Sequence, residues 1–414
     1  MKKNGFTLVE LLSIVVILGI IVVVALPQIS GSIGSKKEKQ YNKIVKIVEN
    51  AGKVYLTENV TRDSVSIDKL IKSDYLTSGL KNPINNAPLT GCVKKIISDG
   101  VTKYKYEVDN CPNYLTTYIM DLYDNEETSI ENGLKKDNTP DQNIRYYGSN
   151  PNNYVSFNNE LWRIIGVFGN NVKLVRSEKL GDLSWDSSEE SINAGGGVNE
   201  WSQADLQVYL NKMYYGGTSV TCYNGENNTT TTCPTGTIDE TSKSLIDYHT
   251  WNTGAPNYNT LYNSTTKSFD TIEFYKAERG SVNGKTCSSG TYCNDTVTRT
   301  TEWPGYIGLP YVTDWAYASG EDDCNTKIDV SSTYKCKNNN WMHYGSTNND
   351  TTWVMSPFAL PVNANVVWHV RGGGRTGNVG AARPLSAFPT IYLKSNIIIE
   401  SGKGTSSDPY ELSL

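Results

Sequence analysis

The chain has 414 residues, a formal net charge of −5 at pH 7 and 20% charged residues. This length is enough for two or three domains. The mild acidity argues against nucleic-acid binding, which favours a basic face, so no nucleic acid is expected among the partners. The 27 tyrosines are candidates for a recognition surface or for core positions with one solvated edge.

The N-terminus joins a short basic leader, residues 1–5, to a long apolar segment. The 21 residues from Phe6 to Leu26 would span about 30 Å as a helix, the thickness of a bilayer core. Lys2 and Lys3 place the N-terminus in the cytoplasm and the residues after Pro27 outside. A secretory signal peptide carries its small residue after the apolar segment, but here Gly5 precedes it, so we expect the segment to stay on the mature protein.

These residues resemble the N-terminus of a type IV prepilin. The resemblance implies that a membrane peptidase cuts between Gly5 and Phe6 and methylates the new amine of Phe6. It also implies that Glu10, a costly carboxylate within the apolar segment, pairs with the N-terminal amine of a neighbouring subunit. Gly19 and Pro27 fall where the family carries helix-loosening residues. An ordinary signal anchor with a chance glutamate is the alternative.

The eight cysteines fall into four pairs of near neighbours in the sequence. An even count in an extracellular setting favours disulfides, although eight cysteines allow 105 pairings and nearest-neighbour pairing is only the preferred one. Zinc is the competing explanation, but the chain has no C-x-x-C and its three histidines are scattered, so no metal is predicted. The preferred pairs are Cys92/Cys111, Cys222/Cys233, Cys287/Cys293 and Cys324/Cys336.

Residues 28–115 are similar to a compact pilin head. Apolar residues at helical spacing predict that a helix continues from Pro27 to about Tyr55. Ser66 and Asp68 are candidate caps for a short second helix, and two strands are expected around 91–97 and 102–108. Residues 121–143 are acidic, polar and almost free of large apolar side chains, so a linker is predicted at 116–143.

Residues 144–414 are predicted to form a β-rich surface domain. Two β-rich runs, 160–168 and 172–176, flank a Gly-Asn-Asn turn and predict a hairpin. The segment 201–211 is expected to be a helix with Ser202 as its N-cap. This succession resembles a bacterial surface domain of undefined function that is common in Firmicutes, and more distantly the C-type-lectin architecture. Its landmarks are Leu161–Gly166, the 201–211 segment, Gly308-Leu309 and Arg383-Pro384.

The predicted surface domain shows no recognisable catalytic motif. There is no G-x-S-x-G, and the acidic runs lack the spacing of an EF-hand, so no enzyme activity and no cofactor are predicted, and calcium stays an open alternative. Tryptophans are candidates to stack on a sugar or to fill the core, with burial favoured for each one: Trp303, Trp315, Trp341 and Trp368. Arginines near the predicted strands are candidate buried partners of carboxylates: Arg163, Arg371 and Arg383.

The sequence therefore predicts an α+β protein with a long N-terminal helix, a small β head and a lectin-like C-terminal domain. It is expected to be a single-pass membrane protein with its N-terminus inside before assembly, and then part of an extracellular filament. The favoured function is a minor type IV pilin-like subunit that displays an adhesive domain to a glycan or surface-protein ligand. The expected partners are the prepilin peptidase/methylase and other pilins. The alternatives are a pseudopilin of a secretion or DNA-uptake system and a surface anchor that never polymerises.

Overall fold

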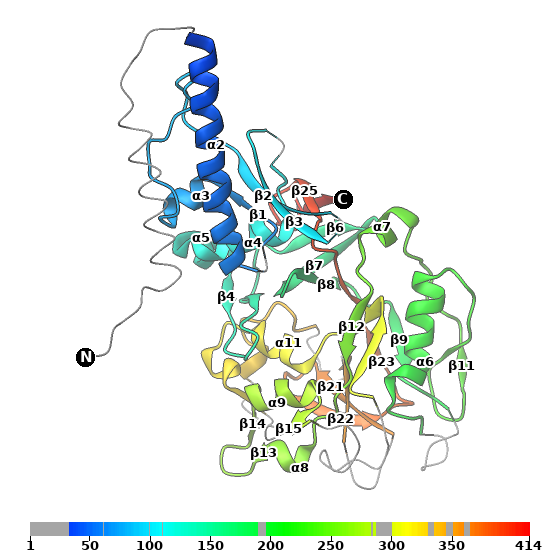
Figure 1. Ribbon diagram of the computed structural model, residues 1–414. Coiled ribbons are helices and arrows are strands. Elements are labelled where there is room, and N and C mark those ends of the chain that lie inside the picture. Colours follow the sequence, from blue (N-terminus) through cyan, green and yellow to red (C-terminus); the bar gives the residue numbers. More distant parts are fainter. Residues whose placement is uncertain are drawn as a thin grey trace. The chain divides into compact units, whose positions relative to one another are not determined.

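The chain divides into two compact units, Met1–Asn113 and Tyr114–Leu414. The computed structural model (Figure 1) describes residues 33–60, 62–98, 100–109, 111–188, 196–282, 285–286, 300–329, 335–344, 351–359 and 365–414. Within these residues the protein is rich in β-structure, with mixed sheets and short helices other than α2. None of the helices in these ranges is long and apolar enough to cross a membrane. The predicted span, residues 6–27, lies outside the described ranges.

The first unit pairs one long helix with a small antiparallel sheet (Figure 1). Helix α2 (Ile33–Glu58) is amphipathic, and its apolar residues at intervals of three and four are buried: Ile44, Val48, Ala51 and Tyr55. The sheet has the order β1–β2–β3, with β1 (Ser64–Ser66), β2 (Cys92–Ser98) and β3 (Val101–Glu107). The predicted helix is present from Ile33 onward and the two predicted strands are confirmed, whereas residues 28–32 lie outside the described ranges.

Two local features of the first unit depend on single residues. The Ser66 hydroxyl accepts a hydrogen bond from the Lys69 amide, so Ser66, one of the two candidates, is the N-cap of α3 (Ile67–Lys72), and Asp68 lies in the first turn. Helix α2 approaches β2 closely at Gly52, where an added Cβ would lie 2.4 Å from the Cβ of Val93. The absence of a side chain at residue 52 therefore sets the distance between helix and sheet.

The second unit is built on two sheets (Figure 1). In the described residues the larger sheet has nine strands, with β18–β24–β8–β7–β6–β26–β25 in line and β4 and β5 attached through β7. Its strands are β4 (Leu134–Lys136), β5 (Ile144–Tyr146), β6 (Tyr154–Phe157), β7 (Glu160–Phe168), β8 (Asn171–Arg176), β18 (Ile307–Gly308), β24 (Thr390–Tyr392), β25 (Ile398–Ser401) and β26 (Tyr410–Ser413). The predicted hairpin is confirmed as β7 and β8, which pair antiparallel.

The second sheet has the order β22–β21–β20–β23–β9. Its strands are β9 (Gly181–Ser184), β20 (Thr351–Pro357), β21 (Val366–Arg371), β22 (Thr376–Gly380) and β23 (Pro384–Ala387). Three short two-stranded ladders pair β10 (Cys222–Tyr223) with β11 (Thr230–Thr231), β12 (His249–Asn252) with β17 (Glu302–Gly305), and β15 (Ser281–Val282) with β16 (Lys285–Thr286). A small three-stranded sheet has the order β13 (Tyr262–Asn263), β14 (Ser268–Asp270), β19 (Lys327–Asp329). The short helices include α7 (Glu240–Leu245), α8 (Tyr258–Leu261), α9 (Thr271–Glu278) and α11 (Val312–Tyr317). The core between these elements contains six fully buried tryptophans: Trp162, Trp185, Trp201, Trp251, Trp353 and Trp368.

The prediction of a linker at 116–143 is wrong. This segment forms helices α4 (Leu115–Asp124) and α5 (Glu126–Asn132) and strand β4, and it belongs to the second unit. Its polar composition is explained by pairing within the fold. Asp137 is buried and accepts hydrogen bonds from Thr139, Asn143 and Arg145.

The predicted helix at 201–211 is also wrong in detail. A 3₁₀ turn, η1 (Trp201–Gln203), precedes α6 (Asp205–Val208), which continues into the π-helical η2 (Tyr209–Tyr215). Ala204 has extended backbone angles and occupies the N-cap position of α6. Ser202 therefore lies in the preceding turn, where its hydroxyl bonds to Glu200.

Candidate functional site

The residues that carry the prepilin resemblance lie outside the ranges that the structure describes. They are Gly5, Phe6, Glu10, Gly19 and Pro27. The candidate site that the structure does describe is a groove on the second unit, which we call the tyrosine groove. It consists of two open hollows that share Tyr262.

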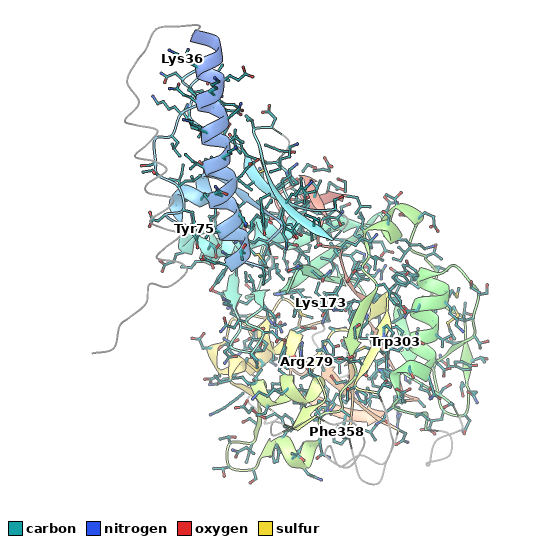
Figure 2. All side chains as sticks on the ribbon, viewed as in Figure 1. Lys36, Tyr75, Lys173, Arg279, Trp303 and Phe358 are labelled. Atoms are coloured by element: carbon teal, nitrogen blue, oxygen red, sulfur yellow. A yellow bond between two sulfur atoms is a disulfide. The ribbon has the colours of Figure 1, made fainter. Side chains whose placement is uncertain are left out.

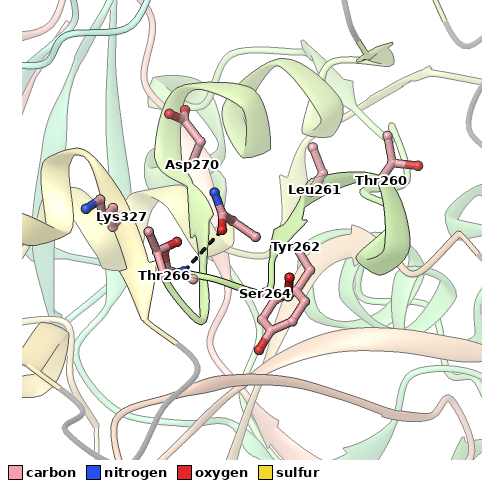
Figure 3. Close-up of a pocket in the computed structure, with 9 residues that line it drawn as sticks. Thr260, Leu261, Tyr262, Ser264, Thr266, Asp270 and Lys327 are labelled. Atoms are coloured by element: carbon pink, nitrogen blue, oxygen red, sulfur yellow. Dashed lines mark hydrogen bonds between the residues drawn. The ribbon is translucent and has the colours of Figure 1, made fainter.

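The first hollow has a volume of about 440 Å³ and a mainly polar lining (Figure 3). Its residues come from α8, the β13–β14 turn and β19: Thr260, Leu261, Tyr262, Asn263, Ser264, Thr266, Ser268, Asp270 and Lys327. The second hollow has a volume of about 350 Å³ and combines aromatic with cationic side chains. Its residues come from α8, β13, β14, β21 and β22 and the turn between these last two strands: Tyr258, Tyr262, Phe269, Trp368, Arg371, Arg375, Thr376, Gly377 and Asn378.

Helix α8 positions the two tyrosines. The side chain of Asn257 caps the helix by accepting a hydrogen bond from the Thr260 amide, and its Nδ2 donates to the carbonyl of Ala359 at 3.0 Å. Tyr258 and Tyr262 are four residues apart, so they meet on one side of this turn. Their rings stack with centroids 4.7 Å apart and planes 25° from parallel.

The tyrosine pair rests on buried aromatic rings. Both tyrosines meet Phe269 edge to face, at 5.3 Å and 5.8 Å between centroids, and Phe269 in turn meets Trp368 at 5.3 Å. Phe269 and Trp368 are buried, whereas Tyr258 and Tyr262 are half-buried. The indole nitrogen of Trp368 donates to the carbonyl of Pro256, which anchors the stack to the loop before α8. The two tyrosines therefore present a supported aromatic surface to solvent.

A polar turn forms the edge of the first hollow. The Asn263 side chain accepts hydrogen bonds from the amides of Thr265 and Thr266, at 3.0 and 3.1 Å, which fixes the turn. The dashed line in Figure 3 marks the bond from Thr266. Asp270 accepts from the first amides of α9 through one carboxylate oxygen, and Lys327 lines the same hollow. Carboxylate, amide, hydroxyl and ammonium groups thus line the same hollow as Tyr262.

Two arginines give the second hollow its positive character. The Nε of Arg371 donates to Nε2 of His369 at 3.0 Å, so this histidine is a neutral acceptor. Burial, reinforced by Arg371 and Arg375, lowers the pKa of His369 to about 3. Burial likewise raises the pKa of Tyr258 above its usual range, so the phenol stays protonated near neutral pH.

The four candidate tryptophans mostly fill the core. Trp315, Trp341 and Trp368 are buried, in agreement with the favoured alternative, and Trp303 is half-buried against Trp201. The two tyrosines of the groove were not singled out, although the Tyr-x-x-x-Tyr spacing inside an asparagine-rich segment was a usable signal.

Two of the three arginine predictions, those for Arg163 and Arg383, are wrong. Arg163 donates to the side chain of Asn153 and to the carbonyl of Trp341, not to a carboxylate. Arg383 is exposed. The arginine that pairs with buried carboxylates is Arg145, which the sequence did not single out.

Three of the predicted disulfides are present: Cys92–Cys111 in the first unit, and Cys222–Cys233 and Cys324–Cys336 in the second. The fourth predicted pair, Cys287 and Cys293, lies outside the described residues. Across the described ranges no group of three or more histidine, cysteine, aspartate or glutamate side chains is arranged to hold a metal ion.

Comparison with known proteins identifies the N-terminal segment. Residues 1–26 match the family described as "Prokaryotic N-terminal methylation motif". No curated protein sequence and no solved structure matches the chain. The match supports a type IV pilin-like or pseudopilin-like protein, and the motif implies processing by a prepilin peptidase, membrane insertion and assembly with other pilins. The lectin-like character of the second unit stays a prediction.

Proposed function

We propose that this chain is a minor subunit of a type IV pilin-like filament, without enzymatic activity, that displays its second unit as a binding domain. The observation that carries the proposal is the methylation motif at residues 1–26. The amphipathic helix α2 on a small sheet supports it, because a pilin needs a helix that continues from the membrane segment into a head. The second unit, Tyr114–Leu414, is large, and this size favours a subunit present in few copies over the main subunit of the filament shaft.

Substitution at Glu10 tests the assembly role. Glu10→Ala should abolish incorporation into filaments, because a neighbouring subunit would lose the carboxylate that pairs with its N-terminal amine. Glu38→Ala is the matched control, since Glu38 is an exposed glutamate on α2. Filaments sheared from cells and probed for the protein give the readout. Equal recovery of Glu10→Ala and Glu38→Ala would contradict the proposal.

We propose a glycan as the ligand of the tyrosine groove. The apolar C–H face of a sugar ring can pack on an aromatic surface, and the stacked Tyr258 and Tyr262 offer one. Hydroxyl groups of the sugar would then reach the polar turn at Asn263 and the cationic side at Arg371. A shallow site of this kind binds weakly, and repeated display along a filament would raise its avidity.

Binding of the full-length protein to a glycan array tests the ligand class. Tyr262→Ala should weaken binding about tenfold, which corresponds to roughly 1.4 kcal/mol, by removing half of the aromatic surface. Tyr248→Ala is the matched control, because Tyr248 is 59% exposed and belongs to a different aromatic cluster with Tyr306. Failure to bind any glycan, or equal binding by both variants, would contradict a glycan site in this groove.

A pseudopilin role is the second candidate function, because the same methylation motif supports it. In that role the second unit would bind an exported substrate. Loss of secretion or DNA uptake in cells that lack the protein, with no label on surface filaments, would favour this alternative.

A further inference from the structure

The second unit contains a buried cluster of charges, separate from the tyrosine groove. Lys173 on β8 and Asp314 on α11 are 0% and 1% exposed, and Lys173 Nζ lies 2.5 Å from Asp314 Oδ2. Arg145 on β5 binds the other carboxylate oxygen at 2.8 Å. The backbone amide of Tyr311 also donates to Oδ2, at 3.0 Å. Figure 2 shows Lys173 within the side-chain-packed interior of this unit.

Aromatic side chains surround the Lys173 ammonium. Its Nζ lies 4.3 Å from the ring centroid of Tyr311 and between 5.3 and 5.6 Å from those of Phe168, Trp251 and Tyr392. Burial of two ions in such surroundings costs several kcal/mol per ion, which the Coulomb attraction repays only in part. A neutral link between the two side chains would remove this cost.

The surroundings of the pair lower the pKa values of both Lys173 and Asp314. Burial lowers the pKa of Lys173 to about 8, although Asp314 opposes this change. Burial alone would raise the pKa of Asp314, but Lys173 and Arg145 bring it down to about 2. The ion pair is therefore the resting arrangement of the unreacted side chains, and the Lys173 amine is easier to deprotonate than an ordinary lysine.

We propose that Lys173 and Asp314 condense to an intramolecular amide (isopeptide) bond in the folded second unit. The ammonium first passes a proton to Oδ2 along the short contact, which gives a neutral amine and a carboxylic acid. Nζ then attacks Cγ, the bond from Cγ to Oδ2 breaks, and a second proton from Nζ leaves with that oxygen as water. The amide keeps one N–H and the carbonyl oxygen Oδ1, so no oxidant, cofactor or second reactant is needed.

Three features of the site favour this condensation. The contact places Nζ at most about 3.7 Å from Cγ, because a C–O bond adds only about 1.2 Å. Well-oriented groups held this close reach effective concentrations of roughly 10⁵ M. Arg145 holds Oδ1, where negative charge develops during the attack, and the absence of exposure at Lys173 limits hydrolysis of the product.

The bond would tie together segments that are far apart in the chain. Lys173 and Asp314 are separated by 141 positions, so the amide would close a large loop between β8 and α11. A covalent tie of this length restricts the unfolded chain, as a disulfide does. In a domain displayed outside the cell, it would also resist mechanical unfolding.

Peptide mass spectrometry of the full-length protein from native cells tests the proposal. After reduction and alkylation, trypsin cannot cut at an acylated Lys173, so segment 164–176 should stay joined to segment 300–327. The joined species should be lighter than the sum of the two peptides by one water molecule. Lys179 and Asp182 provide an internal control, because they form the same type of ion pair at 2.8 Å but are half exposed.

The expected result is the joined peptide, with fragment ions that place the link between Lys173 and Asp314 and no link between Lys179 and Asp182. Lys173→Arg keeps the positive charge but should remove the joined peptide. Recovery of the free peptides 164–173 and 174–176 in full yield from the wild-type protein would overturn the proposal and leave a simple ion pair. Because this readout does not depend on filaments or glycans, its failure would leave the proposed function untouched.

Discussion

Acidification should destabilise the second unit through His369. The imidazole is 1% exposed, accepts a hydrogen bond from Arg371 and has a pKa lowered from 6.5 to about 3. In the unfolded chain the same side chain takes up a proton near pH 6.5, so the unfolded state binds more protons as the pH falls. Stability is therefore fully present above pH 6.5 and is lost as the pH falls toward 3. Each pH unit is worth about 1.4 kcal/mol, which gives a loss of about 3 kcal/mol between pH 6.5 and pH 4.

The tryptophans make this effect measurable in the full-length protein. All nine tryptophans of the chain lie in Tyr114–Leu414, so their fluorescence during urea unfolding reports on the second unit alone. His369→Asn cannot titrate, and its stability should fall less steeply than that of the wild type, by up to about 1.4 kcal/mol per pH unit. His249→Asn is the control and should give a smaller difference, because Asp247 opposes the lowering of the pKa of His249 by burial. Equal slopes for the wild type and His369→Asn would refute the reasoning.

Two further predictions concern packing and buried charge. Asp137→Ala should lower the free energy of unfolding of the second unit by about 3–5 kcal/mol, because Arg145 would lose a buried partner at 2.6 Å. Urea unfolding measures this change, and a loss below about 1 kcal/mol would contradict the prediction. Gly52→Ala should destabilise the first unit by roughly 1–3 kcal/mol, because its Cβ would meet Val93, and hydrogen exchange of α2 amides would report the change. Adding Val93→Ala should restore part of the protection, and no recovery would show that the clash is not the cause.

Local signals in the sequence predicted the parts of the fold that depend on neighbouring residues. The spacing of apolar residues predicted α2, the glycine–asparagine turn predicted the hairpin β7–β8, and the Ser66 hydroxyl predicted the start of α3. Three pairs of cysteines close in sequence form disulfides. Each of these signals lies within about twenty residues of its partner.

Features built from distant segments could not be predicted in this way. Asp137 has the polar character of a linker residue, but it is buried because Arg145 pairs with it and with Asp314, 169 positions further along the chain. The tyrosine groove likewise combines Tyr262 with Arg371 from a different sheet. Composition alone does not distinguish a polar residue in solvent from a buried polar residue whose partners lie far away in the sequence.

The central claim is that this protein is a filament subunit, and immunogold electron microscopy of native cells tests it most directly. Antibody raised against residues 144–412 should place gold along, or at the tips of, thin surface filaments. Sparse labelling along the shaft would indicate a minor subunit, as proposed. Gold confined to the cell envelope, with unlabelled filaments, would contradict the claim.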